Sequence, residues 1–200
     1  YYKDEKLGDV QLLVPGMHNV DNALAAIATA YSLGIDFDAI KQGLVSYSGV
    51  DRRFQYKGKC NGATVIDDYA HHPTEVAAAI TQARSAAGNG DVSVVFQPHL
   101  YSRTQSFAER FADALSHADH VYVCDIYGAR EDPVPGVDST LITSHLPKAR
   151  YVPDMHEAAR LAAREVSEGG ILLTMGAGSI TQCDQDVLDE WEHDGAGSAQ

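Results

Sequence analysis

The stretch DDYAHHPTE, residues 67–75, gathers two carboxylates, a tyrosine and two histidines directly before a proline. Pro73 and Glu75 are typical of a helix start, where a missing N–H costs nothing and a negative charge is stabilised. Helix capping does not account for the other titratable side chains, between residues 67 and 72. The two histidines are adjacent and belong to no HxxxH or HExxH pattern, so they do not predict a dedicated metal site. The stretch instead predicts a loop that carries function.

The stretch QPHLYSRT, residues 97–104, places Arg103 near the start of another expected helix. In one interpretation Arg103 is a solvated surface charge. In the other, its planar guanidinium lies beside helix N–H groups and binds a carboxylate in a bidentate pair, with roughly 1.5–3 kcal/mol per charged hydrogen bond. The position of Arg103 favours carboxylate binding.

The stretch GVDRRF, residues 49–54, carries two adjacent arginines at an expected domain boundary. Arg52 and Arg53 are either surface charges, or one of them reaches across a closing cleft to a phosphate, as an arginine finger does. Near the other end of the chain, GAGSI is a short glycine turn before a helix, which is weak evidence for an anion site.

The stretch GMHNVDNALAA, residues 16–26, places Asn19 and Asn22 three positions apart at a helix entrance, on one face. Capping accounts for one asparagine, and Asp21 or Asn22 is available for it. Two side-chain amides on one face could also bind the polar edge of a base or ribose.

These motifs are positioned by regularly alternating elements. Apolar strands are expected at residues 63–69, 92–98, 120–127, 149–152 and 170–176, and helices at residues 73–87, 103–118, 139–146, 154–168 and 180–193. This alternation predicts an α/β domain with a doubly wound, mostly parallel sheet covered on both faces. Ligands of such sheets bind outside the carboxyl ends of the strands. We therefore expect the loops that follow the strands to converge at one edge.

The first part of the chain has a different pattern. Helices are expected at residues 21–33, with Gly34 as a stop, and at residues 36–47. The charged, turn-rich stretch that begins at Gly49 predicts a boundary. We expect residues 1–48 to be the end of a preceding domain and residues 49–200 to be the α/β domain. Because the chain has no initiator methionine, we also expect it to be a piece of a longer protein.

Composition excludes several classes of protein. A formal net charge of −13 and a pI near 4.9 argue against a general nucleic-acid binder, although local arginines can still bind a nucleotide. The three cysteines are widely spaced without a CxxC pair, which predicts neither a disulfide framework nor a zinc knuckle. No apolar run reaches the roughly 18 residues of a membrane span. We expect a cytoplasmic protein without a membrane partner.

Five motifs in this order and spacing, GMHNVDNALAA, GVDRRFQ, DDYAHHPTE, FQPHLYSRT and DIYGAREDPVPGVDS, closely resemble the C-terminal portion of the Mur ligases. The resemblance runs from Gly16 to about Ile180, within the branch that joins L-alanine to UDP-N-acetylmuramate in peptidoglycan synthesis. It implies a Rossmann-like C-terminal domain, preceded by the end of a central ATPase domain. The chain contains no GxxxxGK[ST], so the resemblance implies that the N-terminal domain and most of the ATPase domain are absent and that this piece is inactive alone.

The reaction implied by the resemblance uses ATP and Mg²⁺ to convert the sugar's carboxylate into an acyl phosphate, which the amine of L-alanine attacks. The resemblance implies that the Mg²⁺ ligands lie mainly in the absent part. On the nucleotide side, it implies that Asn19 and Asn22 contact the nucleotide, that Arg53 approaches the γ-phosphate and that Asp68 is the acid beside the nucleotide.

On the amino-acid side, the resemblance implies that Tyr69 and His71 line the pocket, with His71 also catalytic beside Arg53 and Asp68. It implies that Arg103 holds the amino acid's carboxylate. Many relatives carry a second arginine where this chain has Leu100. The carboxylate clamp is therefore expected to depend on Arg103, with help from a neighbour such as His99 or a backbone amide.

Two alternatives remain open from the sequence. A recycling ligase that joins a tripeptide to the same sugar has similar motifs, and an assay of alanine against tripeptide separates the two. A non-catalytic nucleotide-binding or interaction module could keep the fold without the reaction. A phosphate loop in the upstream sequence would favour the ligase.

Overall fold

The computed structural model describes residues 1–14, 16–60 and 62–197, and the backbone alone at residues 18, 60 and 191–197. The chain divides into two compact units, residues 1–51 and the residues from Arg52 onward. This division lies close to the boundary expected at residues 48–49. Each unit is described by itself.

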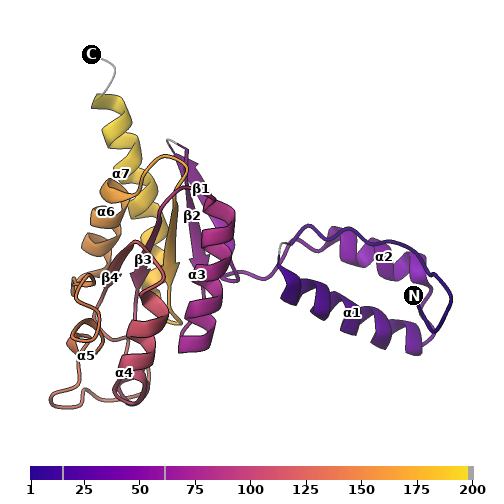
Figure 1. The fold of residues 1–200 in the computed structure, drawn as a ribbon, viewed down its shortest axis with the longest axis horizontal. Coiled ribbons are helices and arrows are strands. Elements are labelled where there is room, and N and C mark those ends of the chain that lie inside the picture. Colours follow the sequence, from indigo (N-terminus) through magenta and orange to yellow (C-terminus); the bar gives the residue numbers. More distant parts are fainter. Residues whose placement is uncertain (15, 61, 198–200) are drawn as a thin grey trace. The chain divides into compact units, whose positions relative to one another are not determined.

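The first unit contains α1 (Met17–Ser32) and α2 (Phe37–Ser46) (Figure 1). Helix α1 begins earlier than expected, with Gly16 as its N-cap and no side-chain cap, so the expected capping by Asp21 or Asn22 is wrong. Helix α2 begins as expected, because the Asp36 carboxylate accepts the N–H of Asp38 at 3.0 Å.

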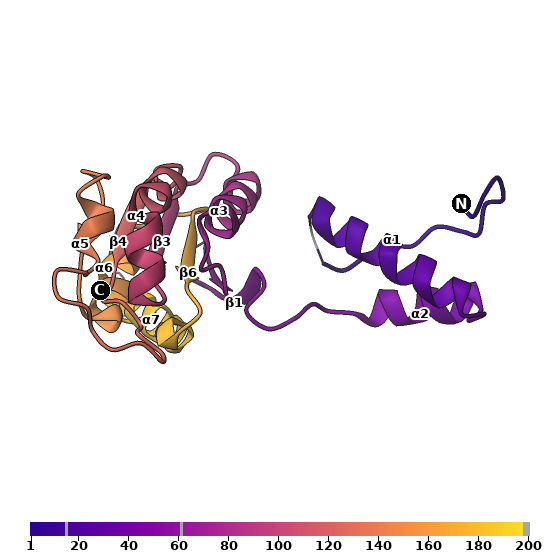
Figure 2. The same ribbon diagram turned by 90° about the horizontal axis from the view of Figure 1, so that it is seen from below.

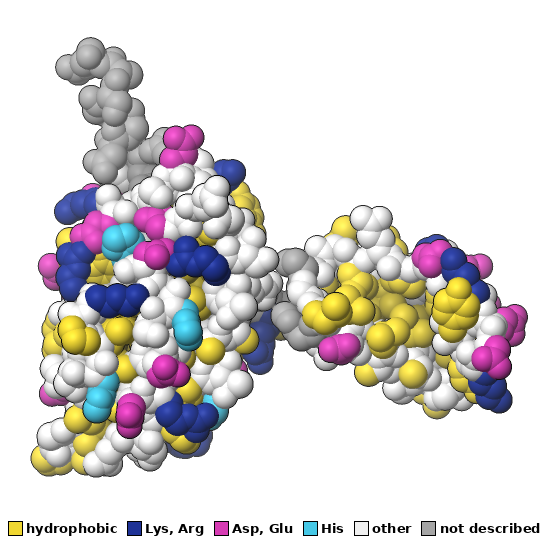
Figure 3. Space-filling model, in the orientation of Figure 1, with side chains coloured by type: hydrophobic (Ala, Val, Ile, Leu, Met, Phe, Trp, Pro, Cys, Tyr) yellow, Lys and Arg dark blue, Asp and Glu magenta, His cyan; other side chains and the backbone are white. Residues whose placement is uncertain are grey.

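Apolar side chains of the first unit face solvent (Figure 3). Among its described residues, Ile40 is the one hydrophobic side chain that is buried, whereas Met17, Leu24 and Leu33 are 58–76% exposed. A groove of about 840 Å³ lies along α1, lined by Met17, Leu24 and other residues of the helix and by residues of the segment before it. In the described structure, residues 1–51 therefore do not enclose a core of their own.

The second unit is built on a six-stranded sheet in the order β1-β2-β6-β3-β4-β5. Four pairings are parallel, and β1 alone runs antiparallel to its neighbour β2 among the described strands. The bounds are β1 (Gln55–Cys60), β2 (Ala63–Asp68), β3 (Val92–Phe96), β4 (His120–Val123), β5 (Arg150–Tyr151) and β6 (Ile171–Met175). The mostly parallel α/β fold is confirmed.

Strand β1 was not predicted, since its residues formed part of the expected turn-rich boundary. It pairs with β2 from Gln55 opposite Asp67 to Cys60 opposite Ala63. Because β1 contains lysine and glycine, it lacks the apolar pattern that is typical of a strand. Charged residues are common on edge strands, where they prevent pairing with the sheet of another molecule. The sequence of β1 therefore carries only a weak signal for a strand.

Helices cover both faces of the sheet. Figure 2 shows α3 and α4 on one face and α6 and α7 on the other. The bounds are α3 (Pro73–Ala87), α4 (Tyr101–Leu115), α5 (Thr140–Thr143), α6 (Met155–Glu165), a 3-10 turn η1 (Ser179–Cys183) and α7 (Asp184–Gly197). None of the helices in the described residues is long and apolar enough to cross a membrane.

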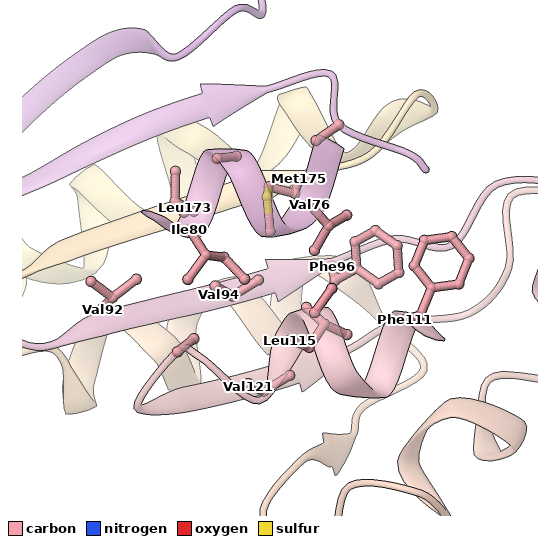
Figure 4. Packing of buried hydrophobic residues seen from close by; sticks show 14 of the residues in the cluster. Val76, Ile80, Val92, Val94, Phe96, Phe111, Leu115, Val121, Leu173 and Met175 are labelled. Carbon is pink, nitrogen blue, oxygen red and sulfur yellow. The ribbon is translucent and has the colours of Figure 1, made fainter. Parts of the chain in front are cut away.

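A hydrophobic cluster lies on each side of the sheet. On the side of α3 and α4, the rings of Phe96 and Phe111 lie 5.2 Å apart between centroids and pack beside Ile80 and Leu115 (Figure 4). Burying each such side chain contributes about 1.5–3 kcal/mol, so these layers fix the strands whose carboxyl ends carry the polar loops.

Candidate functional site

The loops that follow the strands meet at one edge of the sheet. The N–H of Gln97 donates to Met175 O at 2.9 Å, and the N–H of Gly176 donates to Asp68 O at 3.1 Å. The N–H of Tyr127 donates to Pro98 O at 2.8 Å. These bonds join the ends of β2, β3 and β6 to the segment after β4, so the expected convergence of the loops that follow these strands is confirmed.

A row of four rings lies along this edge. The ring centroids are 5.1 Å apart between Tyr69 and His71, and 5.9 Å apart between His71 and His99. His99 then stacks on Tyr127 at 5.8 Å, with an interplanar angle of 21°. The rings come from three loops and are partly exposed. They form a wall that is apolar on its ring faces and polar at its nitrogen and hydroxyl tips.

Arg103 reaches this wall from the first turn of α4. Its Nη1 lies 3.2 Å from His99 Nδ1, and its side chain is half-buried. Burial lowers the pKa of His99, and the charge of Arg103 is the second largest cause of this shift. The ring is therefore neutral and accepts this hydrogen bond. A guanidinium has five N–H donors in a fixed plane, which leaves Arg103 with donors for a bidentate carboxylate.

His71 is held by its own loop. Its Nδ1 lies 2.9 Å from Tyr69 O, and its backbone N–H donates to Glu75 Oε2 at 3.1 Å. A carbonyl oxygen accepts and cannot donate, so Nδ1 carries the proton in this contact. In the neutral ring Nε2 is then the proton acceptor, as general-base catalysis requires.

Arg52 and Arg53 have different environments. Arg52 points inward, where its Nη2 donates to Gly176 O at 2.6 Å and its Nε to buried Asp67 at 3.3 Å. Arg53 is exposed, with its guanidinium 6.0 Å from the ring centroid of Tyr69. The structure thus presents one of the two arginines to solvent beside the ring wall.

The backbone around Arg53 is strained and tied down. Arg52 and Phe54 have φ angles of +61° and +50°, a conformation that costs on the order of 1–3 kcal/mol per residue. The carboxylate of Asp68 accepts the N–H of Phe54 and the N–H of Ala70, each at 2.8 Å. Burial raises the pKa of Asp68. Its contacts therefore position the loops on both sides, and the expected direct role of Asp68 beside a nucleotide stays a prediction.

The seven candidate residues divide between the two units. Arg53, Asp68, Tyr69, His71 and Arg103 lie at the sheet edge of the second unit. Asn19 and Asn22 lie in α1 of the first unit, three positions apart on one helix face. The structure brings the first five together and leaves the role of the two asparagines as a prediction.

Glu131 is a residue of this edge that sequence reasoning did not single out. It accepts the N–H of Ser102 at 2.9 Å and the hydroxyl of Ser102 at 2.5 Å. The N-cap of α4 is Leu100, which has no capping side chain, and Glu131 supplies the missing acceptor from another loop. No local pattern predicts this contact, because Glu131 and Ser102 lie 29 positions apart in the chain.

These contacts bear on the help that Arg103 was expected to receive from a backbone amide. The N–H of Ser102 is bonded to Glu131, and the N–H of Leu100 donates to Tyr127 O at 2.9 Å. Leu100 is buried, with a φ of +74°. These two amides of the α4 start are therefore occupied, whereas Arg103 lies beside His99, and the carboxylate clamp stays a prediction.

Comparison with known proteins identifies the second unit. Residues 52–178 match the family described as "Mur ligase, glutamate ligase domain". Two similar curated proteins are both named UDP-N-acetylmuramate--L-alanine ligase. The protein from Paenarthrobacter aurescens is 53% identical over 86% of this chain and 38% of its own length. The protein from Saccharopolyspora erythraea is 47% identical over 93% of this chain and 39% of its own length.

A solved structure agrees. The crystal structure of UDP-N-acetylmuramate-alanine ligase MurC from Thermotoga maritima superposes with a TM-score of 0.76 at 32% identity, over 92% of this chain and 40% of that one. A murein peptide ligase from Psychrobacter arcticus, at 22% identity and a TM-score of 0.67, shares the fold. The chain spans about two fifths of the length of the two curated ligases from Paenarthrobacter aurescens and Saccharopolyspora erythraea. Its family match covers more than half of its own residues, and the chain belongs to the Mur ligase family.

Proposed function

We propose that the protein joins L-alanine to UDP-N-acetylmuramate in peptidoglycan synthesis, with ATP as the energy source, and that residues 49–200 bind the amino acid. The observation that carries this proposal is the wall of four rings with Arg103 bonded to its third ring, His99. The wall offers one guanidinium for a small carboxylate. The names and identities of the curated relatives support the same substrate pair.

On the amino-acid side, Arg103 binds the carboxylate of L-alanine and His99 holds the guanidinium in place. An amine attacks a carbonyl only after it has lost its extra proton. The Nε2 atom of His71 is the base that takes this proton, because Nδ1 is committed to Tyr69 O. The rings of Tyr69 and Tyr127 limit the access of water to the acyl phosphate.

On the nucleotide side, the exposed Arg53 stabilises the negative charge that develops on the transferred phosphate. Residues 1–48 form the end of the ATP-binding domain, with Asn19 and Asn22 toward the nucleotide. The solvent-exposed apolar face of α1 supports this assignment, because it requires cover from further protein.

ATP supplies the phosphoryl group, and Mg²⁺ neutralises charge on the phosphates when bound. Arg53 fits the phosphates, since it is an exposed cation on a fixed loop. Each oxygen of Asp68 accepts a backbone N–H, so this carboxylate orders the loops. We propose that the Mg²⁺ ligands lie mainly in the part of the protein outside this chain. We place the protein in the cytoplasm, without nucleic acid or membrane as partners.

The direct test of this function uses the whole protein with ATP, Mg²⁺ and UDP-N-acetylmuramate, and measures phosphate release with L-alanine or a tripeptide as acceptor. We expect phosphate release with L-alanine and only background release with the tripeptide. Release that requires the tripeptide would assign the protein to recycling. No release with either acceptor, together with retained nucleotide binding, would indicate a non-catalytic module.

The KM for L-alanine should depend on the charge of His99. The pKa of His99 is lowered from its ordinary value of about 6.5, so the ring is neutral at pH 7 and accepts from Arg103. As the pH falls through this lowered pKa, the ring gains a proton, loses its acceptor and repels the guanidinium. We expect the KM to rise with an inflection below pH 6.5, measured by initial rates.

Two variants identify the source of this inflection. His99→Gln keeps a hydrogen-bond acceptor but does not titrate, so its KM should vary less with pH. His145→Gln changes an exposed histidine elsewhere and should keep the wild-type profile. An unchanged profile in the His99→Gln variant would remove His99 from this role.

A further inference from the structure

A second cluster of reactive side chains lies away from the ring wall, where α6 meets η1 and α7. His156 Nδ1 lies 2.7 Å from Asp186 Oδ2 and 3.8 Å from Cys183 Sγ. Within the described residues, these three side chains are the His, Cys, Asp and Glu group whose ligand atoms all lie within 4.8 Å of one another. The proposed reaction uses none of them.

We propose that His156, Cys183 and Asp186 form a binding site for one Zn²⁺ ion. Zinc takes thiolate sulfur at about 2.3 Å and imidazole nitrogen or carboxylate oxygen at about 2.0–2.2 Å, in a tetrahedron. Around a tetrahedral ion these bond lengths place neighbouring ligand atoms roughly 3.3–3.6 Å apart. The separations of 3.8 Å and 2.7 Å reach this range with small side-chain rotations. A water molecule would complete the four ligands.

The kinds of ligand select the ion. Thiolate and imidazole suit Zn²⁺ and similar transition metals, whereas Mg²⁺ and Ca²⁺ prefer sets made of oxygen alone. A Cys, His and carboxylate set therefore differs in chemistry from any Mg²⁺ site that serves the phosphates of ATP. The proposed site is a separate feature of the domain.

The surroundings hold the ligands in position. Arg160 Nη1 donates to Asp186 Oδ1 at 3.1 Å, which leaves Oδ2 turned toward His156. An outer partner of this kind orients a ligating carboxylate. Asp154 and Asp184 add negative charge near the thiol and offset the positive charge of Arg160. Cys183 is buried within the second hydrophobic cluster, with its Sγ toward His156 Nδ1.

An ion at this position would join three elements. His156 lies in the first turn of α6, Cys183 ends η1, and Asp186 lies in the first turn of α7. A Zn²⁺ ion would link α6 to α7 on the face of the sheet opposite α3 and α4 (Figure 2). The expected consequence is stabilisation of the folded state, because the ion binds the folded protein and not the separated ligands.

The test measures Zn²⁺ binding to the purified protein by competition with a chromophoric chelator, and measures thermal unfolding with and without Zn²⁺. We expect one Zn²⁺ per chain, a higher unfolding temperature with Zn²⁺, and no competition from excess Mg²⁺. Co²⁺ as a substitute should give the near-ultraviolet absorption of a cobalt–thiolate bond.

Variants show whether these residues bind the ion. Cys183→Ser and His156→Gln should each weaken Zn²⁺ binding by on the order of 100-fold and abolish the cobalt–thiolate absorption or reduce it. Because Cys183 is buried, its replacement can disturb the fold. His156 and Asp186 are more exposed, so the His156→Gln and Asp186→Asn variants should keep the fold, and circular dichroism would verify this. Cys60→Ser, which changes a thiol of β1, should bind as the wild type does. Absence of stoichiometric Zn²⁺ binding, or wild-type affinity in folded His156→Gln and Asp186→Asn variants, would overturn the proposal.

Discussion

Replacement of Arg103 by alanine should raise the KM for L-alanine by roughly 10- to 150-fold for each charged hydrogen bond lost, while the KM for ATP changes little. The side chain of Arg103 is half-buried, and its guanidinium lies 3.2 Å from His99, the third ring of the wall. The amides of Ser102 and Leu100 are occupied by other partners, so they cannot take over the carboxylate.

Steady-state kinetics of the whole protein, with each substrate varied in turn, would measure this effect. Arg110→Ala is the matched control, because it removes an exposed guanidinium from the same helix and should leave both KM values unchanged. Arg103→Lys keeps the charge but not the planar fork, and should recover only part of the affinity. An unchanged KM for L-alanine in Arg103→Ala would exclude the proposed carboxylate site.

Replacement of Arg53 by alanine should lower kcat by on the order of 10²–10³-fold, with a small effect on the KM for L-alanine. The reason is that Arg53 is placed to stabilise charge that develops during phosphoryl transfer, and such an interaction is lost from the transition state rather than from amino-acid binding. The bonds of Arg52 and Asp68 hold the backbone on either side of Arg53.

Single-turnover measurement of acyl-phosphate formation would locate the defect at the phosphate step. Lys59→Ala removes an exposed cation from β1 in the same unit and should keep the wild-type kcat. A wild-type kcat for Arg53→Ala would mean that its exposed side chain does not reach the nucleotide. In that case the assignment of the two arginines by resemblance would be wrong.

Local chemistry explains why much of the fold was predictable. The bounds of α3 agree with the expected range, because Pro73 fits the first turn and Glu75 accepts the N–H of His72 in a capping box. Strands β3 and β6 are buried along their whole length, and buried parallel strands read as continuous apolar runs. Once these strands were recognised, the rule for ligand sites in α/β sheets placed the motifs at one edge.

Other features depend on contacts that the sequence does not encode locally. Helix α4 begins at Tyr101, before the expected residue 103, although Leu100 is a poor N-cap with a positive φ. Glu131 makes this start possible from a separate loop. The inward orientation of Arg52, in contrast to the exposed Arg53, likewise depends on its bond to Gly176 O, which lies far away in the sequence.

The proposed zinc ligands show the same limit. Cysteine spacing predicted no zinc site, because Cys183 has no paired cysteine nearby and His156 lies on a different helix. Packing of α6 against α7 brings the ligand atoms together. Only a structure reveals a cluster of this kind.

The most direct measurement is a crystal structure of the whole protein with UDP-N-acetylmuramate, L-alanine and a non-hydrolysable ATP analogue. We expect the carboxylate of L-alanine to accept two hydrogen bonds of about 2.7–3.2 Å from Arg103, with its amine facing His71 Nε2. L-Alanine bound away from the ring wall, with Arg103 bonded to another protein group, would contradict it.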